Sequence, residues 1–243
     1  MFQWTPDMVR FMRDASELGD YHRELADHIC PLLSPEESLC DAGCGLGYLS
    51  LALSPRCRRV TAVDIAAPAL AVLRENLAHT GISNVRVHCG DMGALPSGEN
   101  FDTMVFCLFG GMEETLRLAA GRCRKQVVLV KRNHPEHRFT CSGAGREHRT
   151  LSGALAFLEA RGIPCQQESL VLRMDQPFRS LEDAALFFRI YSRNPVDGFL
   201  TPHDLMPLLT PCEFPGFPWV LPVERSLGIL TLPAAALPRQ NIT

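Results

Sequence analysis

The amino-acid sequence predicts an α/β fold: a Rossmann-like, seven-stranded, mostly parallel sheet with helices on both faces. Two observations carry this prediction. From residue 38 to residue 173, short apolar runs alternate with amphipathic helical patterns, which is typical of a parallel sheet covered on both faces. The first apolar run ends in glycines at alternate positions over residues 43–47, which indicates a sharp turn from a buried strand into a helix.

Composition favours one soluble domain. The chain has 243 residues, 46% of them hydrophobic and 21% charged, with a net charge of −3. That charge gives no general attraction to nucleic acid or to an anionic membrane. No apolar run approaches the roughly 20 residues of a membrane span, and the first residues lack a signal-peptide pattern. We therefore expect a cytoplasmic protein with no membrane partner.

Ten cysteines occur without any C-x-x-C pair, and several fall inside predicted strands. Free cysteine packs as a small apolar residue, and a cytosolic chain keeps it reduced. A metal site at His134, His137, Cys141 and His148 is an alternative, but this spacing matches no zinc pattern. We expect reduced core thiols and no metal.

The N-terminal segment, residues 1–35, predicts two helices. Thr5 has the character of an N-cap and is followed by proline at the first helical position. A turn at residues 19 and 20 separates the two helical patterns, and the second ends near Pro35.

Residues 36–174 and 226–243 form the predicted core. Its predicted strands are residues 38–42, 59–64, 85–89, 101–107, 125–131, 166–173 and 227–232. Its predicted helices are residues 46–54, 67–80, 112–122 and 150–161. The second of these helices is typical: leucines repeat along one face, and Gly81 follows as a C-cap.

Residues 175–225 interrupt this alternation with eight of the chain's 18 prolines. One helix is predicted, at residues 181–192, capped by Ser180. The remainder, including residues 214–219, is predicted to be irregular because proline removes backbone donors. Long irregular inserts in compact domains usually carry function. We expect this insert to cap a substrate pocket; the alternative is a homodimerisation arm.

The glycine turn belongs to the pattern D-x-G-x-G-x-G, formed by Asp41, Gly43, Gly45 and Gly47. A dinucleotide fold instead has its third glycine three residues after the second, with a pyrophosphate on the helix N-terminus. A carboxylate at Asp41 would repel phosphate and attract a cationic ligand. Asp64 ends the next predicted strand, where an acid can accept hydrogen bonds from both ribose hydroxyls.

This pattern resembles the first motif of the class I S-adenosylmethionine-dependent methyltransferases. The resemblance covers about residues 36–175 and the last strand. It implies that S-adenosylmethionine is the cofactor and S-adenosylhomocysteine the product. Two alternatives stay open at this point: a nicotinamide-dependent oxidoreductase and a non-catalytic S-adenosylmethionine-binding protein.

The resemblance also implies the cofactor site. The glycine turn would surround the cofactor's amino-acid end, Asp64 would bind the ribose, Asp91 would bind the adenine amino group, and the N-terminal segment would fold over the cofactor as a lid. Tyr21 in that lid either reaches the ligand or anchors helix packing. The expected cofactor-binding residues are Asp41, Gly43, Cys44, Gly45, Gly47, Asp64, Ile65, Asp91, Met92, Cys107 and Tyr21.

Methyl transfer from a sulfonium depends mostly on alignment, and a general base is needed only when the acceptor must lose a proton. The sequence therefore assigns no catalytic residue. Residues 107–111 read Cys-Leu-Phe-Gly-Gly, unlike the Asn/Asp-Pro-Pro-Tyr/Phe of family members that methylate amines of nucleic acid or glutamine. We expect a small-molecule acceptor; an RNA or protein acceptor is the alternative, and the basic stretch 122–149 would suit RNA.

Overall fold

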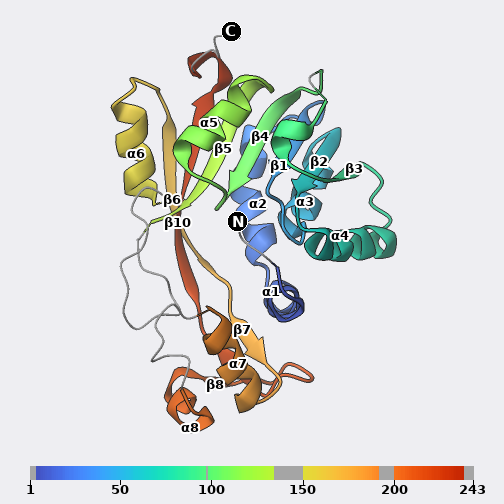
Figure 1. The fold of residues 1–243 in the computed structure, drawn as a ribbon, viewed down its shortest axis with the longest axis vertical. Helices are drawn as coiled ribbons and strands as arrows, with labels where there is room; N and C mark the ends of the chain where they lie inside the picture. The colour runs from blue at the N-terminus through green and yellow to red at the C-terminus, as the bar shows by residue number, and fades with distance from the viewer. Residues whose placement is uncertain (1–3, 97, 134–149, 192–199, 238–243) are drawn as a thin grey trace.

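The computed structural model describes residues 4–96, 98–133, 150–191 and 200–237. In this part of the chain, seven strands form a sheet in the order β3-β2-β1-β4-β5-β10-β6 (Figure 1). Their bounds are β1 Ser38–Ala42, β2 Arg59–Asp64, β3 Val85–Cys89, β4 Phe101–Cys107, β5 Cys123–Arg132, β6 Gln166–Arg173 and β10 Glu224–Pro233. Only β10 runs antiparallel to its neighbours. The predicted fold class is confirmed.

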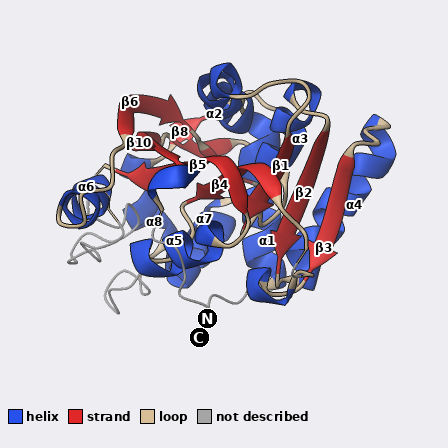
Figure 2. Ribbon diagram, turned by 90° about the horizontal axis from the view of Figure 1, so that it is seen from above, coloured by secondary structure: helices blue, strands red, loops and turns tan. Residues whose placement is uncertain are grey.

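Helices cover both faces of this sheet (Figure 2). Their bounds are α1 Pro6–Leu18, α2 Tyr21–Ile29, α3 Tyr48–Leu53, α4 Ala67–Thr80, α5 Met112–Ala120, α6 Leu151–Glu159, α7 Leu181–Tyr191 and α8 Pro202–Leu205. Helices α2, α3 and α4 pack on one face, and α5 and α6 on the other. None of the helices in the described ranges combines the length and apolar composition that crossing a membrane requires.

Most strand bounds agree with the prediction, and the differences have local causes. Strands β5 and β10 extend beyond the predicted 125–131 and 227–232 because pairing continues past the apolar runs. The start of β5 pairs with β4, its end pairs with β10, and residues 224–226 of β10 pair with β6. Helix α3 begins at Tyr48, not at residue 46, because Gly47 has a φ of +76°, which is left-handed and not helical.

The prediction that the insert is irregular outside its one long helix is wrong. In its described part, β7 Gln176–Phe178, β9 Trp219–Leu221 and β8 Thr210–Pro211 form a small antiparallel sheet in the order β7-β9-β8. The prolines do not prevent it because Pro177 and Pro211 lie in the two edge strands, where an outward-facing N–H is not needed. The alternative role as a dimerisation arm stays a prediction.

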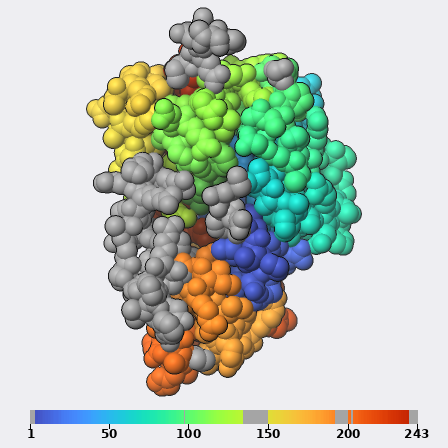
Figure 3. All heavy atoms as spheres, in the orientation of Figure 1, coloured from blue at the N-terminus to red at the C-terminus, as the bar shows by residue number. Residues whose placement is uncertain are grey.

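Helix α1 lies between the core and the insert (Figure 3). On one side, Phe11 is fully buried against Phe178 and Phe187 of the insert, with ring centroids 6.1 and 5.1 Å away. On its other side, Val9 and Met12 pack against the apolar cluster around Leu46, Ala69 and Val72 of the core. The first helix therefore connects the insert to the region of the glycine turn.

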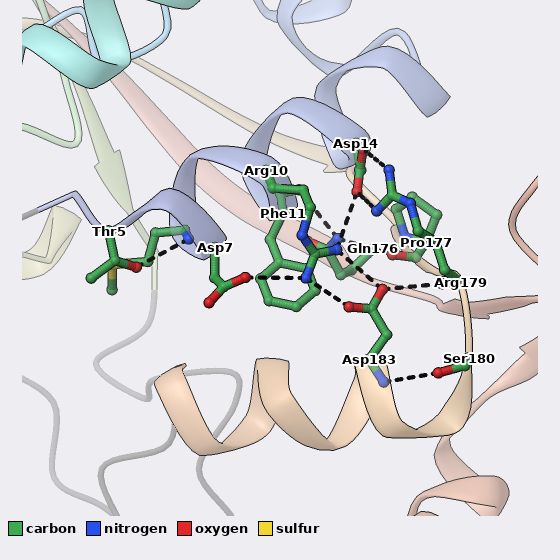
Figure 4. Close-up of polar contacts among 11 residues, drawn as sticks. Thr5, Asp7, Arg10, Phe11, Asp14, Gln176, Pro177, Arg179, Ser180 and Asp183 are labelled. Atoms are coloured by element: carbon green, nitrogen blue, oxygen red, sulfur yellow. Dashed lines mark hydrogen bonds and ion pairs between the residues drawn. The ribbon is translucent and has the colours of Figure 1, made fainter.

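Four charged residues join α1 to the insert (Figure 4). Arg179 donates two hydrogen bonds to the buried carboxylate of Asp14, one of them of 2.9 Å from Nη2 to Oδ1. Arg10 donates to both oxygens of Asp183, at 2.7 and 3.2 Å. The backbone N–H of Arg179 also donates to Asp183 Oδ2 at 3.1 Å. The Asp14–Arg179 and Arg10–Asp183 pairs are linked through this bond and through the Arg10–Asp14 ion pair, so the four residues form one network.

Breaking this network should destabilise the fold. Replacing Arg179 by glutamine leaves the Asp14 carboxylate buried with a weaker partner, and we expect the free energy of unfolding to fall by about 1–3 kcal/mol. Arg23→Gln is the matched control, because the Arg23–Asp20 pair is solvent-exposed and should matter by about 0.5 kcal/mol or less. Urea denaturation measures both; equal effects would contradict the buried role of Asp14.

Candidate functional site

The turn after β1 requires glycine. Gly43, Gly45 and Gly47 have φ values of +72°, +55° and +76°, in the left-handed region that glycine adopts without strain. A Cβ at Gly43 would lie 2.2 Å from the ring of Phe109, and one at Gly47 would lie 2.5 Å from Leu73. Each of these two positions is therefore fixed by both conformation and space.

Asp64, the last residue of β2, is held against this turn. Its Oδ2 accepts the backbone N–H of Gly45 and its Oδ1 that of Ala66, both at 2.8 Å. A carboxylate offers about four lone-pair sites, so each oxygen keeps capacity for a second donor. The side chain is only partly buried. Its geometry fits the predicted binding of two ribose hydroxyls.

Asp41 lies at the end of β1 and is almost completely buried, with an exposed fraction of 1%. Its Oδ2 accepts the hydroxyl of Ser50 at 2.5 Å. Burial raises the pKa of Asp41 to about 6, Ser50 opposes the rise, and the charge of Asp64 adds to it. At neutral pH the carboxylate is therefore mostly ionised and places a negative charge under the turn, which suits a cationic ligand.

The tips of β2 and β3 are joined, because the backbone N–H of Gly90 donates to the carbonyl of Asp64 at 2.9 Å. Asp91 is exposed at this tip, and its Oδ1 accepts the N–H of Gly93 at 2.6 Å. Ile65 is also exposed. Met92, in contrast, is buried, with its sulfur 3.8 Å from Cys40 Sγ. Met92 can therefore serve the site through its backbone only.

The segment after β4 faces the glycine turn. Leu108 has a φ of +54°, which is uncommon for a bulky residue and marks a strained backbone. Phe109 packs against Gly43, and its carbonyl accepts a hydrogen bond of 3.2 Å from Lys131 Nζ at the end of β5. Burial raises the pKa of the Cys107 thiol to about 12. Cys107 therefore stays protonated, and its thiol is no nucleophile at neutral pH.

Tyr21 begins α2 and is buried, with the guanidinium of Arg225 5.3 Å from its ring centroid. Contact between Tyr21 and a ligand stays a prediction. The next residue, His22, stacks on Tyr48, with ring centroids 5.5 Å apart. Burial, with a smaller contribution from the charge of Arg225, lowers the pKa of His22 to about 3, so its ring is neutral.

Sequence reasoning missed four residues at this edge of the sheet: Trp4, His22, Lys131 and Arg225. Trp4 lies over the turn, since a Cβ at Gly45 would be 3.4 Å from its ring. The sequence does mark Lys131 and Arg225 as candidates for the site. Each is a basic residue beside an apolar strand run, at the strand terminus that faces the glycine turn. Trp4 and His22 carry no such signal, because only tertiary packing brings the segment before α1 and the start of α2 to this edge.

Together these residues occupy the carboxyl edge of the sheet, where the parallel strands end. Strand order reverses between β1 and β4, and ligands of open α/β sheets bind at such a switch point. Cys44 completes the turn, with its N–H 3.1 Å from the carbonyl of Val63. Most of the basic stretch 122–149, and all four possible metal ligands, His134, His137, Cys141 and His148, lie outside the described residues. Within the ranges that are described, no group of three His, Cys, Asp or Glu residues could hold a metal.

The raised pKa of Asp41 makes stability depend on pH. The folded state holds this proton up to about pH 6, whereas the ordinary value is 3.8, so the unfolding free energy falls as pH rises through that window. We expect the Asp41→Asn variant to lack this decrease in unfolding free energy, which amounts to about 2–3 kcal/mol in the wild type. Urea denaturation should show that the unfolding free energy of the variant, relative to that of the wild type, increases between pH 4 and pH 7. A pH-independent difference would contradict the raised pKa.

Comparison with known proteins agrees with this geometry. Residues 39–127 match the family model described as a methyltransferase domain. The 23S rRNA (uracil(1939)-C(5))-methyltransferase of Methylococcus capsulatus is 38% identical over 73 residues, which are 29% of this chain and 16% of that protein. The chain thus spans about a sixth of this relative.

Solved structures share the fold. The YcgJ protein of Bacillus subtilis aligns with a TM-score of 0.54 at 18% identity, over 88% of this chain and 98% of that one. A Bacillus halodurans protein described as a methyltransferase aligns with a TM-score of 0.56 at 15% identity, over 87% and 98%. The comparisons thus show a methyltransferase-domain match over residues 39–127, and a fold that these solved structures share, in a chain that carries the glycine turn and the three acids.

Proposed function

We propose that the protein transfers a methyl group from S-adenosylmethionine to a small-molecule acceptor. The observation that carries the proposal is the joint position of the glycine turn, Asp64 and Asp91 at the switch point of the sheet. Asp64 would bind the ribose, and Asp91 the adenine amino group with Ile65 against the ring. The charge of Asp41 would favour the cationic amino-acid end.

S-adenosylmethionine, when bound, would supply an electrophilic methyl group to the acceptor's lone pair and would keep the electrons of its carbon–sulfur bond as S-adenosylhomocysteine. The protein's own contribution is alignment and the exclusion of water. Cys107 and the Leu108–Gly110 segment would border the methyl group. His22 is neutral and Cys107 is protonated, so these two side chains offer neither an imidazolium nor a thiolate at neutral pH.

We further infer that residues 1–35 act as a lid and residues 175–225 as a cap over the core, residues 36–174 and 226–243. Support comes from α1, which packs on the insert through Phe11 and near the glycine turn through Met12. An enclosed acceptor site suits a small molecule. The Arg179→Gln variant should accordingly lose more methyl transfer than S-adenosylhomocysteine affinity.

The experiment is transfer of radiolabelled methyl from S-adenosylmethionine to separate pools of metabolites, RNA and protein. We expect label in the metabolite pool and inhibition by S-adenosylhomocysteine. Absence of transfer to every pool would contradict the proposed activity.

RNA is the second candidate acceptor, because the relative of Methylococcus capsulatus is named as an rRNA methyltransferase. Support for it is weaker: the shared 73 residues are a small part of that protein, and this chain has a net charge of −3. Label in the RNA pool alone would favour this candidate.

A further inference from the structure

Arg225 lies at the carboxyl edge of the sheet and has no acidic partner among the described residues. It is the second residue of β10, and because this strand is antiparallel to β5, its beginning lies beside the end of β5. The Arg225 Nε atom is buried and has no hydrogen-bond partner, and no described residue forms an ion pair with the side chain. Arg225 as a whole is half-buried, and a charge partly withdrawn from water without a partner is unfavourable unless a ligand supplies the opposite charge.

The side chains around Arg225 are neutral. Tyr21 lies under its guanidinium, at 5.3 Å from the ring centroid. Burial raises the pKa of Tyr191, the last residue of α7, to about 12 although the charge of Arg225 opposes the rise. Burial lowers the pKa of His22 to about 3, and its Nδ1 is also buried without a hydrogen-bond partner. Thus Tyr21, Tyr191 and His22 do not neutralise Arg225.

Charges of opposite sign are arranged around Cys107, at the end of β4. Asp41 raises the pKa of its thiol, whereas Arg225 and Lys131 lower it, so all three charges act on this position. Asp41 lies one residue before the end of β1, while Lys131 and Arg225 lie on β5 and β10, on the other side of β4 in the sheet. The edge is therefore negative toward the glycine turn and positive beyond β4.

Given the proposed function, we infer that the methyl acceptor carries a carboxylate or phosphate group, which Arg225 binds. The cationic cofactor would lie on the Asp41 side and the acceptor's anionic group on the Arg225 side. A guanidinium suits this role because its planar set of donors matches both anions with two parallel hydrogen bonds. The Tyr21 ring lies within cation–π distance of the guanidinium.

The first test measures anion binding without knowing the acceptor. Wild type, Arg225→Gln and Arg189→Gln are saturated with S-adenosylhomocysteine and melted in phosphate, in acetate, and in chloride at matched ionic strength. Arg189 is an exposed residue of α7 and serves as the control. We expect phosphate or acetate to raise Tm above the chloride value in wild type and in Arg189→Gln, but not in Arg225→Gln. Equal shifts in all three proteins would overturn the inference.

The second test uses the labelled methyl products of the metabolite pool, separated by anion exchange. We expect the product to be retained, and transfer to fall about tenfold or more in Arg225→Gln, with S-adenosylhomocysteine affinity unchanged. Phosphatase treatment distinguishes the two anions, because only a phosphate ester then loses retention.

Other outcomes decide against the inference. An unretained product formed equally well by Arg225→Gln overturns it while the methyltransferase function stands. An equal loss of S-adenosylhomocysteine affinity assigns Arg225 to the cofactor's carboxylate, and label in RNA alone also overturns it. If wild type transfers no label to any pool, the proposed function fails and the inference fails with it, even where the melting test shows anion binding.

Discussion

Replacing Asp64 by alanine is expected to weaken binding of S-adenosylhomocysteine by roughly 2–3 kcal/mol, or about 30- to 150-fold. In the proposed site the Asp64 carboxylate accepts two charge-assisted hydrogen bonds from the ribose hydroxyls, and both would be lost. The two backbone hydrogen bonds from Gly45 and Ala66 are lost as well, which would loosen the turn around the ligand. Isothermal titration calorimetry measures the change.

Two further variants interpret that result. Asp64→Asn keeps one oxygen and the side-chain shape, so we expect it to lose less affinity than alanine. Asp20→Ala removes an exposed acid and should leave affinity unchanged. Urea denaturation shows whether each protein is folded at the titration temperature. Wild-type affinity in folded Asp64→Ala would remove Asp64 from the site.

Replacing Gly43 by alanine is expected to lower the free energy of unfolding by about 2–4 kcal/mol. One part comes from the φ of +72°, which an L side chain adopts with strain. The other comes from the new Cβ, 2.2 Å from the ring of Phe109, which would have to move. Chemical denaturation measures the loss.

The Gly81→Ala variant separates the cost of backbone strain from the cost of the contact with Phe109. Gly81 has a similar φ of +69°, but a Cβ there would meet nothing within 4 Å. We expect this variant to lose only about 1 kcal/mol. If both alanine variants lost the same stability, the contact with Phe109 would not constrain the turn.

The sequence predicts the core well because its signals are local. The strand ends at Ala42, Asp64 and Cys107 follow from apolar runs bounded by glycines, acids or polar residues, and these bounds agree with the structure. The glycine turn was predictable for the same reason, since spacing alone shows where the backbone must bend. The expected cofactor comes from the resemblance of the D-x-G-x-G-x-G pattern to the methyltransferase motif, and the acids at positions 41 and 64 are compatible with it.

The insert was not predictable in the same way. Its small sheet can form only if the strands that contain proline lie at the edges. The pairing that places Pro177 and Pro211 there is tertiary and leaves no local pattern in the sequence. The network of Asp14 with Arg179 joins residues 165 positions apart, and no local pattern reports it. Arg225 is similar: its contact with Tyr21 exists only once β10 has inserted beside β5.

The most direct measurement is calorimetric titration of the wild-type protein with S-adenosylhomocysteine and, separately, with NAD at pH 7. We predict saturable binding of S-adenosylhomocysteine with one site per chain and no binding of NAD. Binding of NAD with no heat from S-adenosylhomocysteine would contradict the assignment of this edge of the sheet to a sulfonium nucleoside.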